Sequence, residues 1–181
     1  PSELSGLGYH LPGMFGKVLN IDTCYLGAEI MDEIRLFVRD YCASHPEDYP
    51  YFDLHKQEGL MRTLMLRTTS TGETMVVVVF YREDTAARIA LLTAIQERFP
   101  QITALLYVIN GKCNDTIGDQ EIHCFYGREY IEEEMEGLRF RIGPKSFYQT
   151  NSRQAYELYK IAREFAELTG TERGYDLYTG T

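Results

Sequence analysis

Apolar and polar side chains along the first 110 residues follow two spacings, and the longer one predicts two helices. In residues 27–45, apolar side chains recur at helical intervals, with acids early and a histidine late, as the helix dipole favours. Residues 84–100 open with an Asp–Thr pair that can cap a helix, and Pro100 ends the segment. We therefore predict one helix in each segment.

The shorter spacing and runs of β-branched residues predict strands. Residues 16–22 alternate weakly, and residues 102–110 are mostly apolar. Residues 59–83 indicate a hairpin, because the glycine of STGE supplies the positive φ that a tight turn needs. The second hairpin strand contains four consecutive valines, which are typical of the middle of a sheet. The order strand, helix, strand, strand, helix, strand predicts an α+β fold, the ferredoxin-like βαββαβ sandwich.

The sequence changes character after Asn110. Residues 121–127 and 138–144 indicate short strands, and residues 152–170 predict a helix that begins at a serine cap. The last residues, GYDLYTGT, indicate a buried strand that runs into a glycine turn. Such a strand is half of a strand–glycine loop–helix unit, so we expect the chain to be a fragment of a longer protein.

Composition places the chain among globular proteins. It has 181 residues, 44% of them hydrophobic, which is enough for one domain with its own core. No apolar run approaches the roughly 20 residues needed to cross a bilayer, and the N-terminus lacks the features of a signal peptide. The four cysteines are far apart and form no CxxC pair, which argues against a disulfide framework or a zinc site. These features predict a cytoplasmic protein.

The net charge of −9 argues against a protein that binds nucleic acid over its whole surface. A local basic site remains open, because patches of cations contact phosphates and the average charge does not. Residues 137–156 carry no acid and four basic residues, Arg139, Arg141, Lys145 and Arg153. We predict that these four side chains contact phosphates.

The sequence SFYQTN within this basic segment combines aromatic rings with amides. Phe147 and Tyr148 could stack on a nucleobase, while Gln149 and Asn151 each offer one acceptor and two donors to a base edge or a ligand. The alternative is structural: Phe147 lies in the core, and the amides satisfy backbone groups. The residues alone leave both interpretations open.

Four segments together are similar to one enzyme family. FRIGPKSFYQTN (140–151) matches the pattern F-x-I-x-P-x-S-F-x-Q-x-N, and YDLYTGT (175–181) is similar to D-L-Y-C-G-x-G, with Thr179 where many members have a cysteine. GLGYHLPGMFGKVLNIDTC (6–24) and TTSTGETMVVVV resemble further segments of the same family. The chain thus resembles the S-adenosylmethionine-dependent RNA (uracil-5-)-methyltransferases, which make 5-methyluridine in rRNA and tRNA.

This resemblance implies an RNA-binding barrel, a central domain and a catalytic Rossmann-like domain. Residues 1–137 would be the central α/β domain. Residues 138–181 would be the connecting strand, loop and helix, followed by the start of a truncated methyltransferase domain. The catalytic cysteine and the general-base glutamate are expected beyond Thr181, so the fragment should carry no catalytic residue and be inactive alone. The implied cofactor is S-adenosylmethionine and the implied partner is RNA.

The resemblance also implies roles for single residues. Gln149 matches the glutamine that touches the methyl donor, Tyr178 the aromatic residue of the donor motif, and Gly180 its first glycine. Phe147 matches the aromatic residue at the pocket that a flipped uridine enters. Phe147, Asn151 and the four basic residues are therefore the expected substrate-binding set.

Cys24 matches a position that, in some members, is the last ligand of a four-iron, four-sulfur (4Fe-4S) cluster. Such a cluster needs four thiolates, and the other three would lie upstream of Pro1. The alternative for Cys24 is a free buried thiol.

Two other functions remain open. A non-catalytic ferredoxin-like module that binds RNA or a small ligand would place aromatic side chains on an exposed face of the sheet. A methyltransferase for another class of substrate would share only the donor motif. The RNA methyltransferase interpretation instead places the important aromatic residues in the 146–151 loop.

Overall fold

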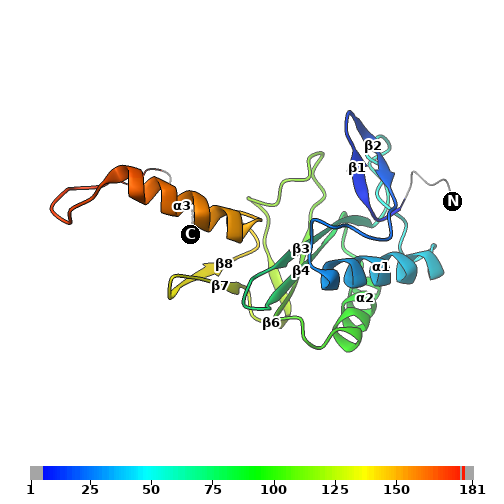
Figure 1. The fold of residues 1–181 in the computed structure, drawn as a ribbon. Coiled ribbons are helices and arrows are strands. Elements are labelled where there is room, and N and C mark those ends of the chain that lie inside the picture. The colour runs from blue at the N-terminus through cyan, green and yellow to red at the C-terminus, as the bar shows by residue number, and fades with distance from the viewer. Residues whose placement is uncertain (1–5, 176, 178–181) are drawn as a thin grey trace.

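The computed structural model describes residues 6–175 and 177, and a four-stranded sheet lies at its centre (Figure 1). Two shorter sheets and three helices surround it. In chain order the elements are β1 (Tyr9–Leu11), β2 (Met14–Leu19), α1 (Glu29–Ser44), β3 (Met61–Thr68), β4 (Thr74–Phe80), α2 (Thr85–Arg98), β5 (Ala104–Ile109), β6 (His123–Gly127), β7 (Ile131–Met135), β8 (Leu138–Ile142) and α3 (Ser152–Ala166).

The central sheet has the order β3-β4-β5-β6. β3 and β4 form the predicted antiparallel hairpin, and Gly72 in its turn has a φ of +85°. β4 and β5 are parallel, which requires a crossover, and α2 provides it. All seven residues of β4 are buried, which confirms the central position predicted from the run of valines.

The ferredoxin-like arrangement is not confirmed, although the mixed α/β class is. In a split βαβ unit another strand lies between the two parallel strands, whereas here β4 and β5 are hydrogen-bonded directly to each other. The strand predicted at residues 16–22 is β2, and it pairs with β1 in a sheet of its own. The physical reason is that β3 and β5 already pair with the two edges of β4, so β2 cannot lie between β4 and β5.

Two apolar clusters cover the two faces of the central sheet. On one face Val76, Val78 and Phe80 pack with α1 and α2. On the other face Val77 and Val79 pack with residues of the loop after β5 and of the β7–β8 hairpin. Figure 1 shows the helices and this hairpin on opposite sides of the sheet. Both faces of the two central strands, β4 and β5, are therefore shielded from solvent.

Arg35 of α1 holds the segment that follows the β1–β2 hairpin. Its guanidinium donates hydrogen bonds to the carbonyl oxygens of Ile21 (2.6 Å) and Asp22 (3.1 Å) and forms an ion pair with Asp32 (2.8 Å). Hydrogen bonds from the Cys24 amide and from Arg35 lower the pKa of Asp32.

Among the described residues, no helix combines the length and the apolar composition that crossing a bilayer requires.

We predict that Phe80→Ala lowers the free energy of unfolding by about 3–5 kcal/mol, because Phe80 is fully buried and its removal leaves a cavity. Phe165→Ala is the matched control, since this side chain is 83% exposed, and the change should stay within about 0.5 kcal/mol. Urea denaturation followed by circular dichroism measures both. Equal losses in the two variants would contradict this description of the core.

Candidate functional site

The loop between β8 and α3 exposes Phe147 and Gln149, and the residue between them is half-buried. Phe147 is 73% exposed and Gln149 is exposed. Tyr148 packs against the second apolar cluster, with its ring centroid 6.0 Å from that of Phe140. Of the two aromatic residues predicted to meet a base, Phe147 is therefore presented to solvent and Tyr148 serves as an anchor.

Arg67 on β3 braces the turn that precedes this loop. Its guanidinium donates hydrogen bonds to the carbonyl oxygens of Ser146 (2.7 Å) and Gly143 (3.4 Å). The Ser146 hydroxyl accepts a hydrogen bond from the Gly143 amide (3.1 Å), which closes the turn. Burial lowers the pKa of Arg67. The backbone on the N-terminal side of Phe147 is thus held by the central sheet.

Asn151 caps α3, and the serine after it is the first helical residue. The Asn151 Oδ1 atom accepts a hydrogen bond from the Gln154 amide (3.0 Å). The sequence analysis expected Ser152 to be the N-cap, but the N-cap is the preceding residue, Asn151. The Asn151 side-chain nitrogen remains able to donate to a ligand, so its predicted contact with substrate stays a prediction.

The acidic strand β7 lies against the first two basic residues of the predicted patch. In the antiparallel register Glu132 pairs with Arg141 and Glu134 with Arg139. The Glu132 carboxylate lies 3.4 Å from Arg141 Nε and 3.8 Å from Arg139 Nη1. Both arginines are exposed but partly neutralised. Glu132 and Glu134 lie in the strand before residues 137–156. The sequence of that segment alone therefore does not reveal that its arginines face acids.

Lys145 and Arg153 are the less neutralised cations near Phe147. The Lys145 ammonium donates a hydrogen bond to the Gln120 carbonyl oxygen (2.6 Å), and Arg153 is exposed. Neither forms an ion pair with a residue that the structure describes. Lys145 also borders an open groove of about 540 Å³, whose lining includes Ile122 and Tyr130. One cation without an ion-pair partner among the described residues thus lies at each end of the exposed loop.

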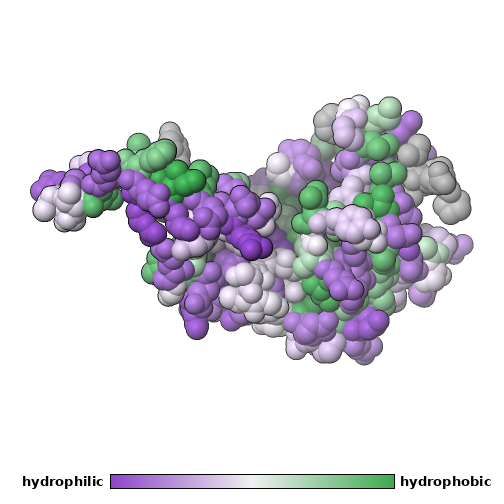
Figure 2. All heavy atoms as spheres, in the orientation of Figure 1, coloured by the Kyte–Doolittle hydropathy of each residue, from purple (hydrophilic) through white to green (hydrophobic). Residues whose placement is uncertain are grey.

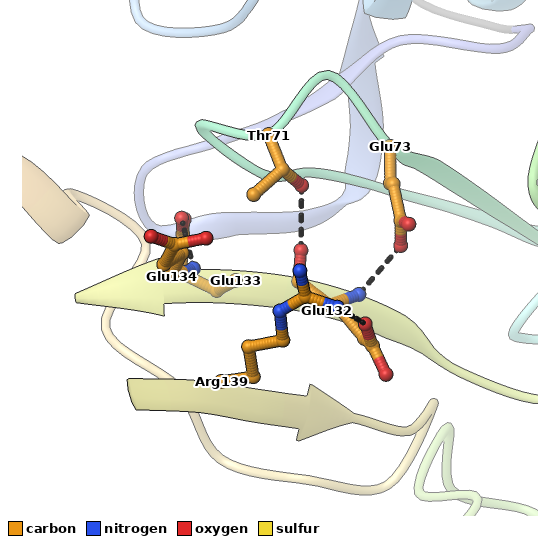
Figure 3. A pocket seen from close by; sticks show the side chains of 6 residues that line it. All are labelled: Thr71, Glu73, Glu132, Glu133, Glu134 and Arg139. Carbon is orange, nitrogen blue, oxygen red and sulfur yellow. Dashed lines mark hydrogen bonds and ion pairs between the residues drawn. The ribbon is translucent and has the colours of Figure 1, made fainter. Parts of the chain in front are cut away.

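Carboxylates attach the β3–β4 turn to β7 beneath this site (Figure 3). Glu73 pairs with Arg128 and accepts a hydrogen bond from the Glu132 amide (2.6 Å). The Thr71 hydroxyl donates to the Glu132 carbonyl oxygen (2.6 Å). A polar cavity of about 230 Å³ remains there, lined by Thr71, Glu73, Glu132, Glu133, Glu134 and Arg139. These carboxylates serve internal contacts, so the similarity of this turn to the family hairpin indicates a structural role.

Glu133 is buried in the same region, with 2% of its surface exposed. Its carboxylate accepts hydrogen bonds from the Ser70 amide (3.0 Å), the Ser70 hydroxyl and the Glu134 amide (3.0 Å). Sequence reasoning missed this residue, because it lies in a run of glutamates that resembles a solvated strand. Strand periodicity could have signalled it: Ile131, Glu133 and Met135 share one face of β7.

Helix α3 projects from the body and is tied to it by a carboxylate (Figure 1). Glu136, in the β7–β8 turn, accepts hydrogen bonds from Arg163 (2.7 and 2.9 Å) and from the Tyr156 hydroxyl (3.0 Å). These bonds lower the pKa of Glu136 to about 2. Ala155 is the buried residue of this helix. Figure 2 shows apolar residues gathered along the projecting helix. The exposed apolar side chains of α3 include Leu158, Tyr159, Ile161 and Phe165.

The remaining predicted residues are separate from this loop. Tyr178 and Gly180, predicted to bind the donor, lie outside the residues that the structure describes. Cys24 is half-buried after β2, and its amide donates to Asp32 (2.7 Å). Within residues 6–175, no group of three or more His, Cys, Asp or Glu side chains could hold a metal ion. Cys24 therefore has no fellow ligands within the described part of the chain, and its role as a cluster ligand stays a prediction.

Comparison with known proteins shows that this chain is similar to proteins named RNA methyltransferases. No protein-family model matches it. It is 74% identical over 181 residues to an "Uncharacterized RNA methyltransferase" of Porphyromonas gingivalis, of which it covers 39%. It is 56% identical over 182 residues to a protein of the same name from Bacteroides thetaiotaomicron, of which it covers 40%. The chain thus spans about two fifths of the length of these curated relatives.

A solved structure of a tRNA methyltransferase is also similar to this chain. The tRNA (uracil-54, C5)-methyltransferase of Pyrococcus abyssi, in complex with S-adenosyl-L-homocysteine, superimposes with a TM-score of 0.64 and 25% sequence identity. The match covers 83% of this chain and 36% of the Pyrococcus chain. The resemblance to RNA methyltransferases inferred from the sequence is thereby confirmed.

We predict that Glu136→Gln loosens α3, because a neutral amide cannot replace the carboxylate that Arg163 and Tyr156 share. Amide hydrogen exchange in residues 156–166 should become several-fold faster. Glu134→Gln is the matched control, since this exposed glutamate has no hydrogen bond to the described part of α3. Equal protection of α3 in both variants would show that Glu136 does not hold the helix.

The same contact predicts a pH dependence. The pKa of Glu136 falls from 4.5 to about 2 in the folded chain, so the carboxylate stabilises the position of α3 above about pH 4.5. This contribution is lost as the pH falls from there towards 2. A carbon-13 NMR titration of the Glu136 carboxyl group measures it. A midpoint near 4.5 would mean that the ion pair is not formed in solution.

Proposed function

We propose that this chain is part of an RNA (uracil-5-)-methyltransferase, which transfers a methyl group from S-adenosylmethionine to carbon 5 of a uridine in rRNA or tRNA. The observation that carries the proposal is the loop before α3, which presents Phe147 and Gln149 to solvent on a backbone that Arg67 braces. The RNA methyltransferase relatives and the uracil methyltransferase neighbour support it. Such an enzyme would meet its RNA in the cytoplasm.

In this proposal residues 1–137 are a central domain, and residues 138–181 lead into the methyltransferase domain. The exposed apolar stripe of α3 supports this division, because a helix that buries so little is stabilised by packing against another part of the polypeptide. The relatives are long enough to supply that part. The nucleophilic cysteine and the general-base glutamate would also come from it.

The side chains of the loop would form one wall of the site. Gln149 has the acceptor and donors to bind a polar group of the methyl donor, with Tyr178 and Gly180 completing the contact. The donor supplies an electrophilic methyl group on a sulfonium sulfur. Phe147 would stack on the flipped uridine. The RNA around this uridine would be held by Lys145, Arg153, Arg139, Arg141 and Asn151. The two arginines of β8 would exchange their contact with Glu132 for a contact with a phosphate.

The alternative of a non-catalytic RNA-binding module receives less support. That function requires stacking residues on an open face of the sheet. Here apolar clusters cover both faces of the central sheet, and Phe147 lies on the loop. The arrangement therefore favours a site completed by another part of the protein.

Gln149→Ala should weaken binding of S-adenosylhomocysteine to a full-length protein that contains this chain. Loss of a hydrogen bond to a ligand costs about 1–1.5 kcal/mol, which corresponds to about ten-fold in affinity. Isothermal titration calorimetry measures it, and Gln101→Ala, at an exposed glutamine before β5, is the control. Unchanged affinity in the Gln149 variant would remove this residue from the donor site.

Phe147→Ala should weaken binding of a uridine-containing RNA hairpin to the same full-length protein. Stacking of a base on an aromatic side chain is worth about 1–3 kcal/mol, so the loss should be about five-fold or more. Tyr25→Ala is the control, because Tyr25 is 94% exposed and lies next to α1, far from the loop along the chain. Equal RNA affinities in a filter-binding titration would exclude the stacking role.

A further inference from the structure

Two arginines of β3, Arg62 and Arg67, are half-buried, and the chain uses their guanidinium groups to different extents. The Arg62 guanidinium lies over the ring of Phe52, 4.6 Å from its centroid. It also donates hydrogen bonds to three carbonyl oxygens after β5, those of Asn110, Lys112 and Asn114, at 2.7, 2.6 and 2.7 Å. Both terminal nitrogens of Arg62 are therefore engaged within the chain.

Arg67 engages a single guanidinium nitrogen in this way. Its Nη1 atom donates to the carbonyl oxygens of Ser146 (2.7 Å) and Gly143 (3.4 Å). Its Nε and Nη2 atoms donate no hydrogen bond to a residue that the structure describes. These two atoms are not sealed in the core, because Arg35 Nε is the only buried arginine nitrogen without a partner in the described chain. Three N–H donors of Arg67 thus remain open.

No carboxylate among the described residues pairs with Arg67. Burial alone lowers its pKa, whereas hydrogen bonds to carboxylates raise the pKa of Arg128 and of Arg163. An arginine is rarely buried without a counter-charge, because removing an unpaired cation from water costs free energy. An anion from outside the described chain would offset this cost.

Arg67 lies at the base of the exposed loop. Met65 packs on the second apolar cluster, and Arg67 shares its face of β3, because residues two apart on a strand point to the same side. The carbonyl oxygen nearest to Arg67 belongs to Ser146, the residue immediately before Phe147, which is 73% exposed. A cation with open donors therefore adjoins the side chain that is proposed to stack on the uridine.

We propose that Arg67 binds a phosphate of the RNA next to the uridine that is methylated. The Nε–H and one Nη2–H lie on one edge of the planar guanidinium and can donate to two oxygens of the same phosphate. The two carbonyl oxygens that hold Nη1 fix this plane in advance.

This inference rests on the proposed function, because it takes RNA as the ligand. A uridine stacked on Phe147 brings a phosphate on each of its two sides, so an anion is present wherever the base is bound. The sequence of the basic segment does not reveal this cation, since Arg67 precedes Ser146 by 79 residues.

The salt dependence of RNA binding separates a phosphate contact from a structural brace. Each phosphate that a protein cation neutralises adds about 0.7 for single strands, or 0.9 for duplexes, to the slope of log affinity against log salt concentration. In a full-length protein that contains this chain, Arg67→Gln removes the charge and Arg67→Lys keeps it. Arg98→Gln is the matched control, because Arg98 is exposed at the end of α2.

Filter binding of a uridine-containing RNA hairpin at several salt concentrations measures these slopes. Arg67→Gln should weaken binding by about ten-fold at low salt and make the slope shallower by about 0.7–0.9. Arg67→Lys should keep the slope of the unmodified protein, and Arg98→Gln should change neither quantity. An unchanged slope in Arg67→Gln, or equal slopes in the Gln and Lys variants, would overturn the phosphate contact and leave Arg67 as a brace.

A second measurement locates the phosphate and needs no variant to fold. In the unmodified protein, an uncharged methylphosphonate in place of one of the two phosphates beside the uridine should weaken binding by about ten-fold. The same RNA should lose less than about two-fold with Arg67→Gln, because the contact is already absent. Full affinity of the unmodified protein for both methylphosphonate RNAs, or equal losses in the two proteins, would overturn the proposal.

Other sources of the anion give different results. If the affinity for S-adenosylhomocysteine differs between the Gln and Lys variants while their RNA slopes agree, the anion is the donor carboxylate and the phosphate contact is wrong. An unmodified full-length protein that does not bind the hairpin would overturn the proposed function and this inference together. Failure of the phosphate contact alone leaves the binding of the unmodified protein intact.

Discussion

Hydrogen-bonded carboxylates attach the C-terminal third of the chain to the central sheet. A two-stranded hairpin such as β7–β8 is marginal alone, and here Ile131 and Ile142 bury it against the sheet. Apolar contact is not directional, and Glu73 and Glu133 supply directed hydrogen bonds between the β3–β4 turn and β7. The loop and α3 continue directly from this hairpin. Their position therefore depends on one buried and one half-buried carboxylate, both of them hydrogen-bonded.

The elements that the sequence predicted well are those whose signal is local. The helices expected at 27–45 and 84–100 are α1 and α2, because apolar spacing and end signals act within a few residues. The hairpin at 59–83 is β3–β4, with its glycine in the turn. The partner of the strand at 16–22 was not predictable in this way. It depends on which sheet edges remain free once distant strands have paired.

The site shows the same limit at the level of single side chains. Sequence identified the 146–151 loop, but Phe147 and Tyr148 are both aromatic, and the direction of the backbone decides which of them is exposed. Burial of Glu133 depends on donors from Ser70, some sixty residues away along the chain. The structure shows which side chains of this loop are exposed, and their binding roles stay predictions. It adds the supporting carboxylates, which no linear motif reveals.

The cross-strand pairing of β7 with β8 has a consequence for how nucleic acid would be bound. Binding of a cationic side chain releases cations that are condensed on the RNA phosphates. An arginine that still faces Glu132 neutralises less phosphate charge, so it would release fewer of these ions. The dependence of affinity on ionic strength would then be shallower than four basic side chains suggest. Glu132 would also repel phosphates that come close to it. It would therefore favour RNA backbones whose phosphates contact the arginines and stay away from Glu132.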